Sequence, residues 1–186
     1  MIYWQDKIGT TTAKAKLDGT NYIDFFSVQS DDLVGGTAPD KGSITIQGVA
    51  VPTSLWAVGE LRGYKFEQDH RCTSGAGVQY QPHLRIFPTN DNAGTFSFTY
   101  DYFLLHVDGT TSAGGTCTMS GTITAGDKTA NIGQYVACLI DATNIQGGDM
   151  IVGRLIRDAG TYASDIAMCE FGIHAPVDKT GFPLGL

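Results

Sequence analysis

The chain has 186 residues, a formal net charge of −7 and only 17% charged residues, and it contains 24 glycines. Such an acidic chain lacks the basic surface that binding to nucleic acid requires. No apolar run reaches the roughly 18 residues of a membrane-spanning helix. Abundant glycine and threonine favour strands joined by turns over helices, and the length suits one domain.

Residues 1–20 mix Tyr3 and Trp4 with threonines and lysines and show no helical period. We interpret them as an N-terminal arm or edge strand, followed by a β-sandwich domain over residues 21–186. An arm that lies on a neighbouring subunit and a frayed terminus both fit this segment. The N-terminus lacks the basic and apolar parts of a secretory signal, which predicts folding in a cytoplasm.

Short apolar or alternating segments recur along the chain between clusters of Gly, Asp, Asn and Ser. This pattern predicts an all-β, single-domain antiparallel β-sandwich of jelly-roll-like type, with no helix. Pro82 predicts an edge position or a bulge for its strand. The predicted strands are 22–28, 43–51, 55–61, 64–67, 78–87, 95–107, 116–124, 132–140, 150–157 and 166–177.

The clearest strand is predicted over residues 95–107. Five large side chains at alternate positions share one face, which we expect to be buried, whereas Phe103 and Leu105 make the end of the other face apolar. The residues of the buried face are Phe96, Phe98, Tyr100, Tyr102 and Leu104.

Residues 150–178 read as two apolar strands joined by a loop of small and polar residues. We interpret them as a hairpin at the centre of the sandwich, because strands that are apolar on both faces are typically covered on both sides. Asp158 and Asp165 flank the loop and are predicted to cap backbone N–H groups. Arg154 and Arg157 are predicted to form ion pairs that hold this loop.

The four cysteines have no zinc-ligand spacing. Cys138 and Cys169 lie in apolar runs and are predicted to be small core residues. A disulfide between any two cysteines is compatible with the sequence, but a reducing cytoplasm disfavours it. His70 and Cys72 lie in a polar stretch that we interpret as an exposed loop.

Candidate catalytic or metal-binding residues are few. His83 and His174 lie on apolar strands, where a histidine is more often packed or hydrogen-bonded than a metal ligand. Glycoside hydrolysis needs two positioned carboxylates, for which Asp101, Asp165 and Glu170 are the candidates. No catalytic motif accompanies them, and we predict a protein that is not an enzyme and has no cofactor.

Several segments together resemble a β-sandwich domain found in virion proteins of tailed bacteriophages. The resemblance covers about the C-terminal 110 residues, and it departs from the family pattern at Arg85, Ile86 and Ala175. The segments that carry it are Pro82-His83, the aromatic strand 96–105, Arg154 to Asp158, Thr161-Tyr162 with Asp165, and Phe171 to His174 followed by Asp178.

The resemblance implies a non-enzymatic, trimeric capsid decoration (cement) protein of the virion, assembled in the host cytoplasm. Its partners would be its own copies and the major capsid protein. The alternative is a carbohydrate-binding module of a receptor-binding or fibre-tip protein, with Trp56, Tyr80 and Tyr162 as exposed aromatic residues that stack on sugars. The candidate contact residues are Tyr3, Trp4, His83, Arg85, Arg157, Asp158, Tyr162, Asp165 and His174.

Overall fold

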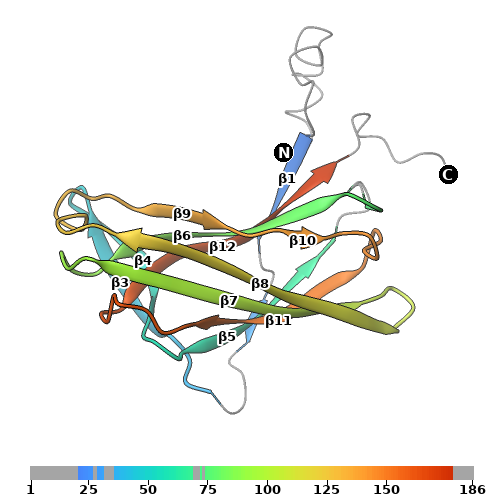
Figure 1. The fold of residues 1–186 in the computed structure, drawn as a ribbon, viewed down its shortest axis with the longest axis horizontal. Helices are drawn as coiled ribbons and strands as arrows, with labels where there is room; N and C mark the ends of the chain where they lie inside the picture. The colour runs from blue at the N-terminus through green and yellow to red at the C-terminus, as the bar shows by residue number, and fades with distance from the viewer. Residues whose placement is uncertain (1–20, 27–28, 32–35, 69–71, 73, 178–186) are drawn as a thin grey trace, which may run out of the picture.

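The computed structural model describes residues 21–26, 29–31, 36–68, 72 and 74–177. Twelve strands and no helix occur in these ranges, and they form two antiparallel sheets (Figure 1). The prediction of an all-β, jelly-roll-like antiparallel sandwich is therefore confirmed. The predicted arm over residues 1–20, with Tyr3 and Trp4, lies outside the described residues.

Most strand bounds agree with the predicted segments to within about five residues, but the predicted strands 43–51 and 55–61 are wrong, because each runs across a turn, at Gln47-Gly48 and at residues 57–60. The strands are β1 (Asn21–Phe26), β2 (Gln29–Asp31), β3 (Asp40–Ile46), β4 (Val49–Trp56), β5 (Leu61–Glu67), β6 (Gln79–Pro88), β7 (Gly94–Leu105), β8 (Thr111–Ile123), β9 (Gln134–Ala137), β10 (Ile140–Asp141), β11 (Met150–Arg157) and β12 (Ile166–Val177).

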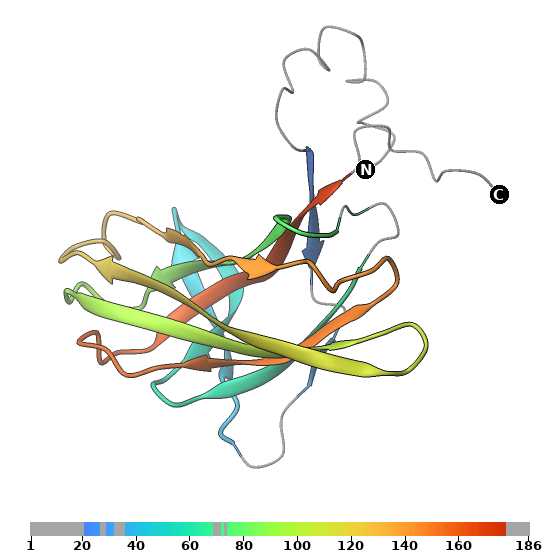
Figure 2. The same ribbon diagram turned by 45° about the vertical axis from the view of Figure 1, so that its right-hand side comes forward.

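The two sheets have seven and five strands. In the five-stranded sheet the order is β2-β5-β11-β7-β8, and in the seven-stranded sheet it is β10-β6-β12-β4-β3, with β9 also on β6 and β1 also on β12. One edge of β12 pairs with β4 near its start and with β1 from Gly172 to Val177. Figure 2 shows β1 and the end of β12 running together at one end of the sandwich.

The predicted hairpin of residues 150–178 is wrong. β11 lies between β5 and β7 in one sheet, and β12 lies beside β6 in the other. The loop between them therefore crosses from sheet to sheet instead of turning within one. Both strands are central, which explains why both are apolar, but composition alone does not tell a hairpin loop from a crossing loop.

The core lies between the sheets, and the aromatic face of β7 is a large part of it. Phe96, Phe98, Tyr100 and Leu104 are buried, and Tyr102 packs against the core while partly exposed, as the alternation predicts. Rings from the facing sheet meet them edge to face. The contacts include Trp56 with Phe98 at 5.6 Å and Phe171 with Tyr100 at 5.1 Å between ring centroids, a favourable arrangement for aromatic pairs.

Pro82 lies in an interior strand and not at an edge. On one side β6 pairs with β12, and Pro82 is opposite Ile173. On the other side β10 pairs only as far as Tyr80 and β9 begins opposite His83. The ladder is thus interrupted beside Pro82, which has no N–H to donate, and its carbonyl oxygen accepts from the N–H of Cys138.

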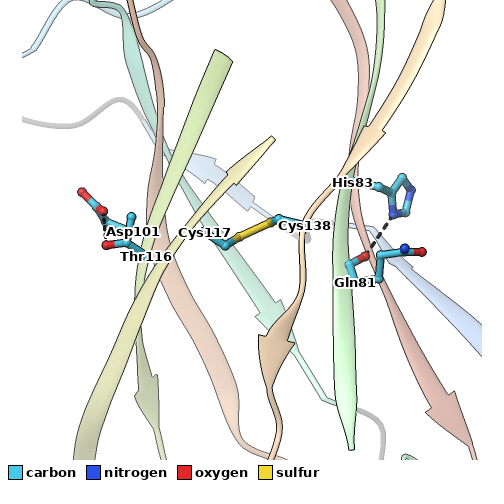
Figure 3. The surroundings of a disulfide bond; sticks show 6 residues. All are labelled: Gln81, His83, Asp101, Thr116, Cys117 and Cys138. Carbon is cyan, nitrogen blue, oxygen red and sulfur yellow. Dashed lines mark hydrogen bonds between the residues drawn. A yellow bond between two sulfur atoms is a disulfide. The ribbon is translucent and has the colours of Figure 1, made fainter. Parts of the chain in front are cut away.

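The cysteines differ from the prediction. Cys117 of β8 forms a disulfide with Cys138, which follows β9, so the bond joins the five-stranded sheet to the seven-stranded sheet (Figure 3). Cys169 is exposed and free instead of being a core residue. A bulge between Met168 and Glu170 in the pairing with β6 shifts the alternation of β12 at this point, which the apolar run did not reveal.

Three exposed aspartates accept hydrogen bonds from the N–H and hydroxyl of one threonine each. These bonds favour the charged carboxylate and hold each pKa below the ordinary value of 3.8. The pairs are Asp91 with Thr129, Asp108 with Thr110 and Asp141 with Thr143.

These aspartates predict a loss of stability in acid. A carboxyl whose folded pKa lies below its unfolded pKa stabilises the fold above the unfolded value, and this contribution is lost as the pH falls through the folded value. We expect the melting temperature to fall as the pH drops below about 4, and to fall less steeply when Asp91, Asp108 and Asp141 are all asparagine. Thermal melts of the wild type and the triple variant at a series of acidic pH values measure this. An equal dependence of the melting temperature on pH in the two proteins would contradict the prediction.

Candidate functional site

A hollow of about 360 Å³ lies over the central strands of the five-stranded sheet. Its volume is near the lower end of the range of about 300–1,000 Å³ for ligand pockets. The antiparallel register places Arg154 opposite Asp101 and Val152 opposite Phe103 on the outward face of β11 and β7. The lining residues are Asp101, Tyr102, Phe103, Val152, Gly153 and Arg154.

Asp101 and Arg154 form the polar side of the hollow. The Nε and Nη2 atoms of Arg154 donate to Oδ2 of Asp101 at 3.3 and 3.2 Å, and the hydroxyl of Thr116 donates to Oδ1 at 2.8 Å. Both side chains remain partly exposed. The Thr116 hydroxyl and Arg154 together hold the carboxylate in place from two neighbouring strands, so this polar pair is ordered before any ligand arrives.

Phe103 forms the apolar side of the hollow, and 42% of its surface is exposed. The neighbouring strand β8 is bulged here, because Tyr102 pairs with Gly115 whereas Leu104 pairs with Ser112. A Cβ atom on Gly114 would lie 2.0 Å from the carbonyl oxygen of Tyr102, so this position requires glycine. Bulges often occur beside binding sites, and this one places Gly114 beside the backbone of Phe103.

Tyr102 also lines the hollow, although its side chain belongs to the inward row of β7 and packs against the core. Burial raises the pKa of its phenol, and the nearby Asp141 carboxylate raises it further. The phenol is therefore a neutral donor and acceptor throughout the physiological pH range.

The outward face of the seven-stranded sheet carries a second polar group, here called the histidine cluster. His83 and His174 come together with their ring centroids 4.1 Å apart, and the Tyr135 ring stacks on His83 at 5.2 Å. The cluster consists of Gln81, His83 and Arg85 on β6, Tyr135 on β9, and Glu170 and His174 on β12.

Glu170 connects the cluster. Its Oε1 atom lies 3.0 Å from Nε2 of His83 and its Oε2 atom lies 3.2 Å from Nε of Arg85. The guanidinium carbon of Arg85 lies 5.8 Å from the centroid of the Tyr135 ring, within cation–π distance. In Figure 3, His83 lies on one side of the Cys117–Cys138 disulfide, and Asp101 and Thr116 lie on the other.

The structure thus brings three of the predicted contact residues together and separates the others from them. His83, Arg85 and His174 share the histidine cluster. Arg157 and Tyr162 are buried, and Arg157 donates to the carbonyl oxygens of Trp56 and Tyr162. These two residues hold the crossing loop between the sheets, so a surface contact through their side chains is excluded.

The predicted roles of the loop charges are wrong. Arg154 pairs with Asp101 across the sheet and not with the loop. Asp158 accepts from the hydroxyls of Thr99 at 2.7 Å and Ser97 at 3.4 Å, and no bond from its side chain to a backbone N–H occurs among the described residues. Asp165 is exposed at the end of the loop, and its backbone oxygen accepts from the hydroxyl of Thr89.

The prediction of exposed aromatic residues that stack on sugars is also wrong for the three residues named. Trp56, Tyr80 and Tyr162 are fully buried, and the exposed aromatic rings of the described residues are Phe103 and Tyr135. The sequence does contain a signal for the exposure of Phe103, which is its place on the threonine-rich face of β7, opposite the buried row.

The structure separates two of the carboxylates that the sequence suggested for glycoside hydrolysis. Asp101 and Glu170 lie on the outward faces of different sheets, so they cannot act on one glycosidic bond. No group of three or more His, Cys, Asp or Glu side chains in these ranges could hold a metal ion. None of the described segments is a helix that could span a membrane.

No family model and no curated protein matches the chain. Similar solved structures include the CBM22-1 xylan-binding domain of Xyn10C from Paenibacillus barcinonensis, at 9% identity and a TM-score of 0.45, over 86% of this chain and 97% of that chain. The C-terminal CBM6 of LamC from Zobellia galactanivorans matches at 12% identity and a TM-score of 0.41, over 83% of this chain and 99% of that chain.

The CBM22-1–GH10 modules of xylanase 10B from Clostridium thermocellum match at 10% identity and a TM-score of 0.41. This match covers 83% of the present chain and 26% of that chain, so the chain spans about a quarter of the xylanase modules' length. Similarity at this level concerns the arrangement of strands and carries no information about the ligand.

Proposed function

We propose that the chain is a non-catalytic carbohydrate-binding protein and that the sugar lies in the hollow over β7 and β11. The observation that carries this proposal is the exposed Phe103 ring beside the ordered Asp101–Arg154 pair. A sugar presents C–H groups on its ring faces and hydroxyl groups around its edge. An aromatic ring packs against the C–H groups. A carboxylate accepts hydrogen bonds from the hydroxyl groups, and a guanidinium donates hydrogen bonds to them.

The electrostatics of the hollow favour a neutral sugar. The charge of Arg154 is matched by Asp101 at 3.2 Å, and the whole chain carries a net charge of −7. A carboxylated or sulfated sugar in the hollow would meet this negative field and the Asp101 carboxylate. We therefore expect neutral oligosaccharides to bind here.

The same geometry supports a role in binding and not in cleavage. Glycoside hydrolases place two carboxyl groups about 5–9.5 Å apart across the bond that they break. Among the described residues that line the hollow, Asp101 is the only carboxylate. Both of its oxygens already accept hydrogen bonds from Thr116 and Arg154.

Replacing Phe103 by alanine tests the proposal. We expect affinity for a neutral oligosaccharide, first selected on a glycan array, to fall by about tenfold or more, because a central aromatic contact typically contributes about 2 kcal/mol or more. Isothermal titration calorimetry measures this loss. Val107→Ala is the matched control, because Val107 is 70% exposed just beyond the end of β7 and does not line the hollow. Binding that Phe103→Ala leaves unchanged would place the sugar elsewhere.

A second candidate function is the trimeric capsid decoration protein that the sequence resemblance implies. The observation in its favour is that three apolar side chains in and beside β9 are exposed, namely Ile132, Tyr135 and Leu139. Exposed apolar side chains of one segment are what a contact with another chain would cover. Sister copies and a major capsid protein would be the partners, and the virion would be the location.

Light scattering of the purified protein distinguishes this second function. A decoration protein is expected to be a trimer in solution and to bind capsids, and changing Leu139 to serine should weaken the trimer. A monomer at all concentrations that has no affinity for capsids would rule it out.

A further inference from the structure

A serine, a histidine and an aspartate form a chain of hydrogen bonds at the turn between β7 and β8, at one end of the sandwich (Figure 1). Nε2 of His106 lies 2.9 Å from the hydroxyl oxygen of Ser112, and Nδ1 of His106 lies 2.9 Å from Oδ2 of Asp149. His106 follows β7, Ser112 is the second residue of β8, and Asp149 precedes β11. None of these three residues, here called the triad, lines the hollow.

Asp149 fixes the orientation and the tautomer of His106. The Asp149 side chain is 2% exposed, and its two oxygens also accept from the backbone N–H groups of Val107 and Gln146 at 3.2 and 2.8 Å. Because a carboxylate only accepts hydrogen bonds, the hydrogen of the neutral imidazole lies on Nδ1. Nε2 then carries the lone pair, so the Ser112 hydroxyl donates its hydrogen to Nε2.

The closure of the turn does not require the Ser112 hydroxyl. The N–H of His106 donates to the carbonyl oxygen of Thr110 at 2.8 Å, and the N–H of Gly109 donates to the carbonyl oxygen of His106 at 2.9 Å. The Asp108 carboxylate accepts from the N–H and the hydroxyl of Thr110 at the same turn. The bond between Ser112 and His106 is therefore additional to those that hold the turn, and its geometry is that of a serine nucleophile and its general base.

Ser112 is partly exposed, and a bulge follows it in β8. Ala113 and Gly114 have no residues opposite them on β7, because the register of the two strands shifts there. Both residues are small and exposed, so a substrate can approach the serine from this side. Backbone N–H groups directly after a nucleophilic serine commonly stabilise the oxyanion that forms during acyl transfer, and the bulge leaves Ala113 and Gly114 outside the regular ladder.

We propose that Ser112 is an activated nucleophile that accepts the acyl group of a small carboxylic ester. Oγ of Ser112 forms a bond to the carbonyl carbon of the ester while its proton passes to Nε2 of His106, and Asp149 stabilises the resulting imidazolium. The bond between that carbon and the alkoxy oxygen then breaks, and the leaving alkoxide takes the proton from Nε2. An alcohol departs, and the acyl group remains bound to Ser112 as an ester.

The chemistry of the triad favours esters as the substrate class. The leaving group of an ester departs more readily than that of an amide, so an ester reacts without the extended contacts that position a peptide for cleavage. Ser112 is only partly exposed, which favours a small acyl group such as acetyl. This modification site belongs to the β7–β8 end of the fold and does not depend on sugar binding in the hollow.

A fluorophosphonate probe, which forms a stable bond with activated serines, tests the proposal. Intact mass spectrometry is expected to show one adduct on the folded chain, and peptide mapping should place it at Ser112. A second reaction, with p-nitrophenyl acetate, should release p-nitrophenol and add one acetyl group to the same residue. Protein unfolded in denaturant should react at least about tenfold more slowly, because only the fold brings the triad together.

Substitutions in the triad separate chemistry from stability. Ser112→Ala should abolish labelling with little change in melting temperature, because other bonds hold the turn. His106→Gln should slow labelling by about a hundredfold, because it removes the general base. Asp149→Asn should slow it by about tenfold or more, because the amide no longer fixes the tautomer. Ser120→Ala is the matched control, since Ser120 is an exposed serine of the same strand, and it should label like the wild type.

Three results would overturn the proposal. These are a folded wild-type protein that takes up no probe, an adduct that Ser112→Ala retains, and labelling of a folded His106→Gln variant at the wild-type rate. Ser112 would then be an ordinary hydrogen-bonded serine. If the His106 variant does not fold, Ser112→Ala and the comparison with the unfolded wild type still provide the readout.

Discussion

Replacing Phe98 by alanine is expected to lower the free energy of unfolding by about 3–5 kcal/mol. Phe98 is completely buried and lies in edge contact with Trp56 and Phe96. Its strand is hydrogen-bonded on both sides, to β8 at Met119 and to β11 at Arg157. The backbone around the lost ring therefore cannot close in, and a cavity remains. Chemical denaturation of the wild type and the variant measures the change, with the slope of unfolding free energy against denaturant concentration fitted for both proteins.

The same strand supplies the control for this substitution. Phe103→Ala removes an identical ring from the outward face of β7, where the ring is partly exposed, and should cost far less stability. If the two variants were equally stable, the assignment of inward and outward faces on β7 would be incorrect.

Removing the Cys117–Cys138 bond is expected to cost about 3 kcal/mol of stability, because the bond closes a loop of 21 residues and restricts the unfolded chain. It also joins the two sheets at β8 and next to β9. Changing both cysteines to serine, or adding a reductant to the wild-type protein, should lower the midpoint of denaturation. A thiol titration before and after reduction confirms the state of the bond.

Cys169→Ser is the matched control for the disulfide. Cys169 is exposed and unbonded, so its replacement should leave the midpoint unchanged. A wild-type protein whose denaturation midpoint does not respond to reductant would show that the bond contributes nothing to the fold in solution.

The strands themselves were predictable because their side-chain alternation is visible in the sequence. The buried row of β7 from Phe96 to Leu104 is the clearest case, since only a strand with one covered face has this period. The pairing of strands was not predictable in the same way. β11 and β12 follow each other in the chain with a loop typical of a hairpin, yet a loop of this length also reaches the opposite sheet.

The candidate sites were predictable only in part. His83, Arg85 and His174 were predicted as contact residues, and the register of β6 with β12 brings them together. The exposure of Phe103 was missed because an exposed phenylalanine and a buried one look identical in a short apolar run. The partner of Cys117 could not be identified either, since contact between β8 and the end of β9 depends on how the two sheets close.

The position of β12 has a consequence for how the protein folds. Its neighbours β1, β4 and β6 come from the first half of the chain, so each pairing closes a loop of roughly 80 to 150 residues. During synthesis these earlier strands emerge before β12 can pair with them, and unpaired strand edges of this kind are prone to aggregation. Refolding is therefore expected on the time scale of milliseconds to seconds or longer, and fragments ending before residue 166 should aggregate.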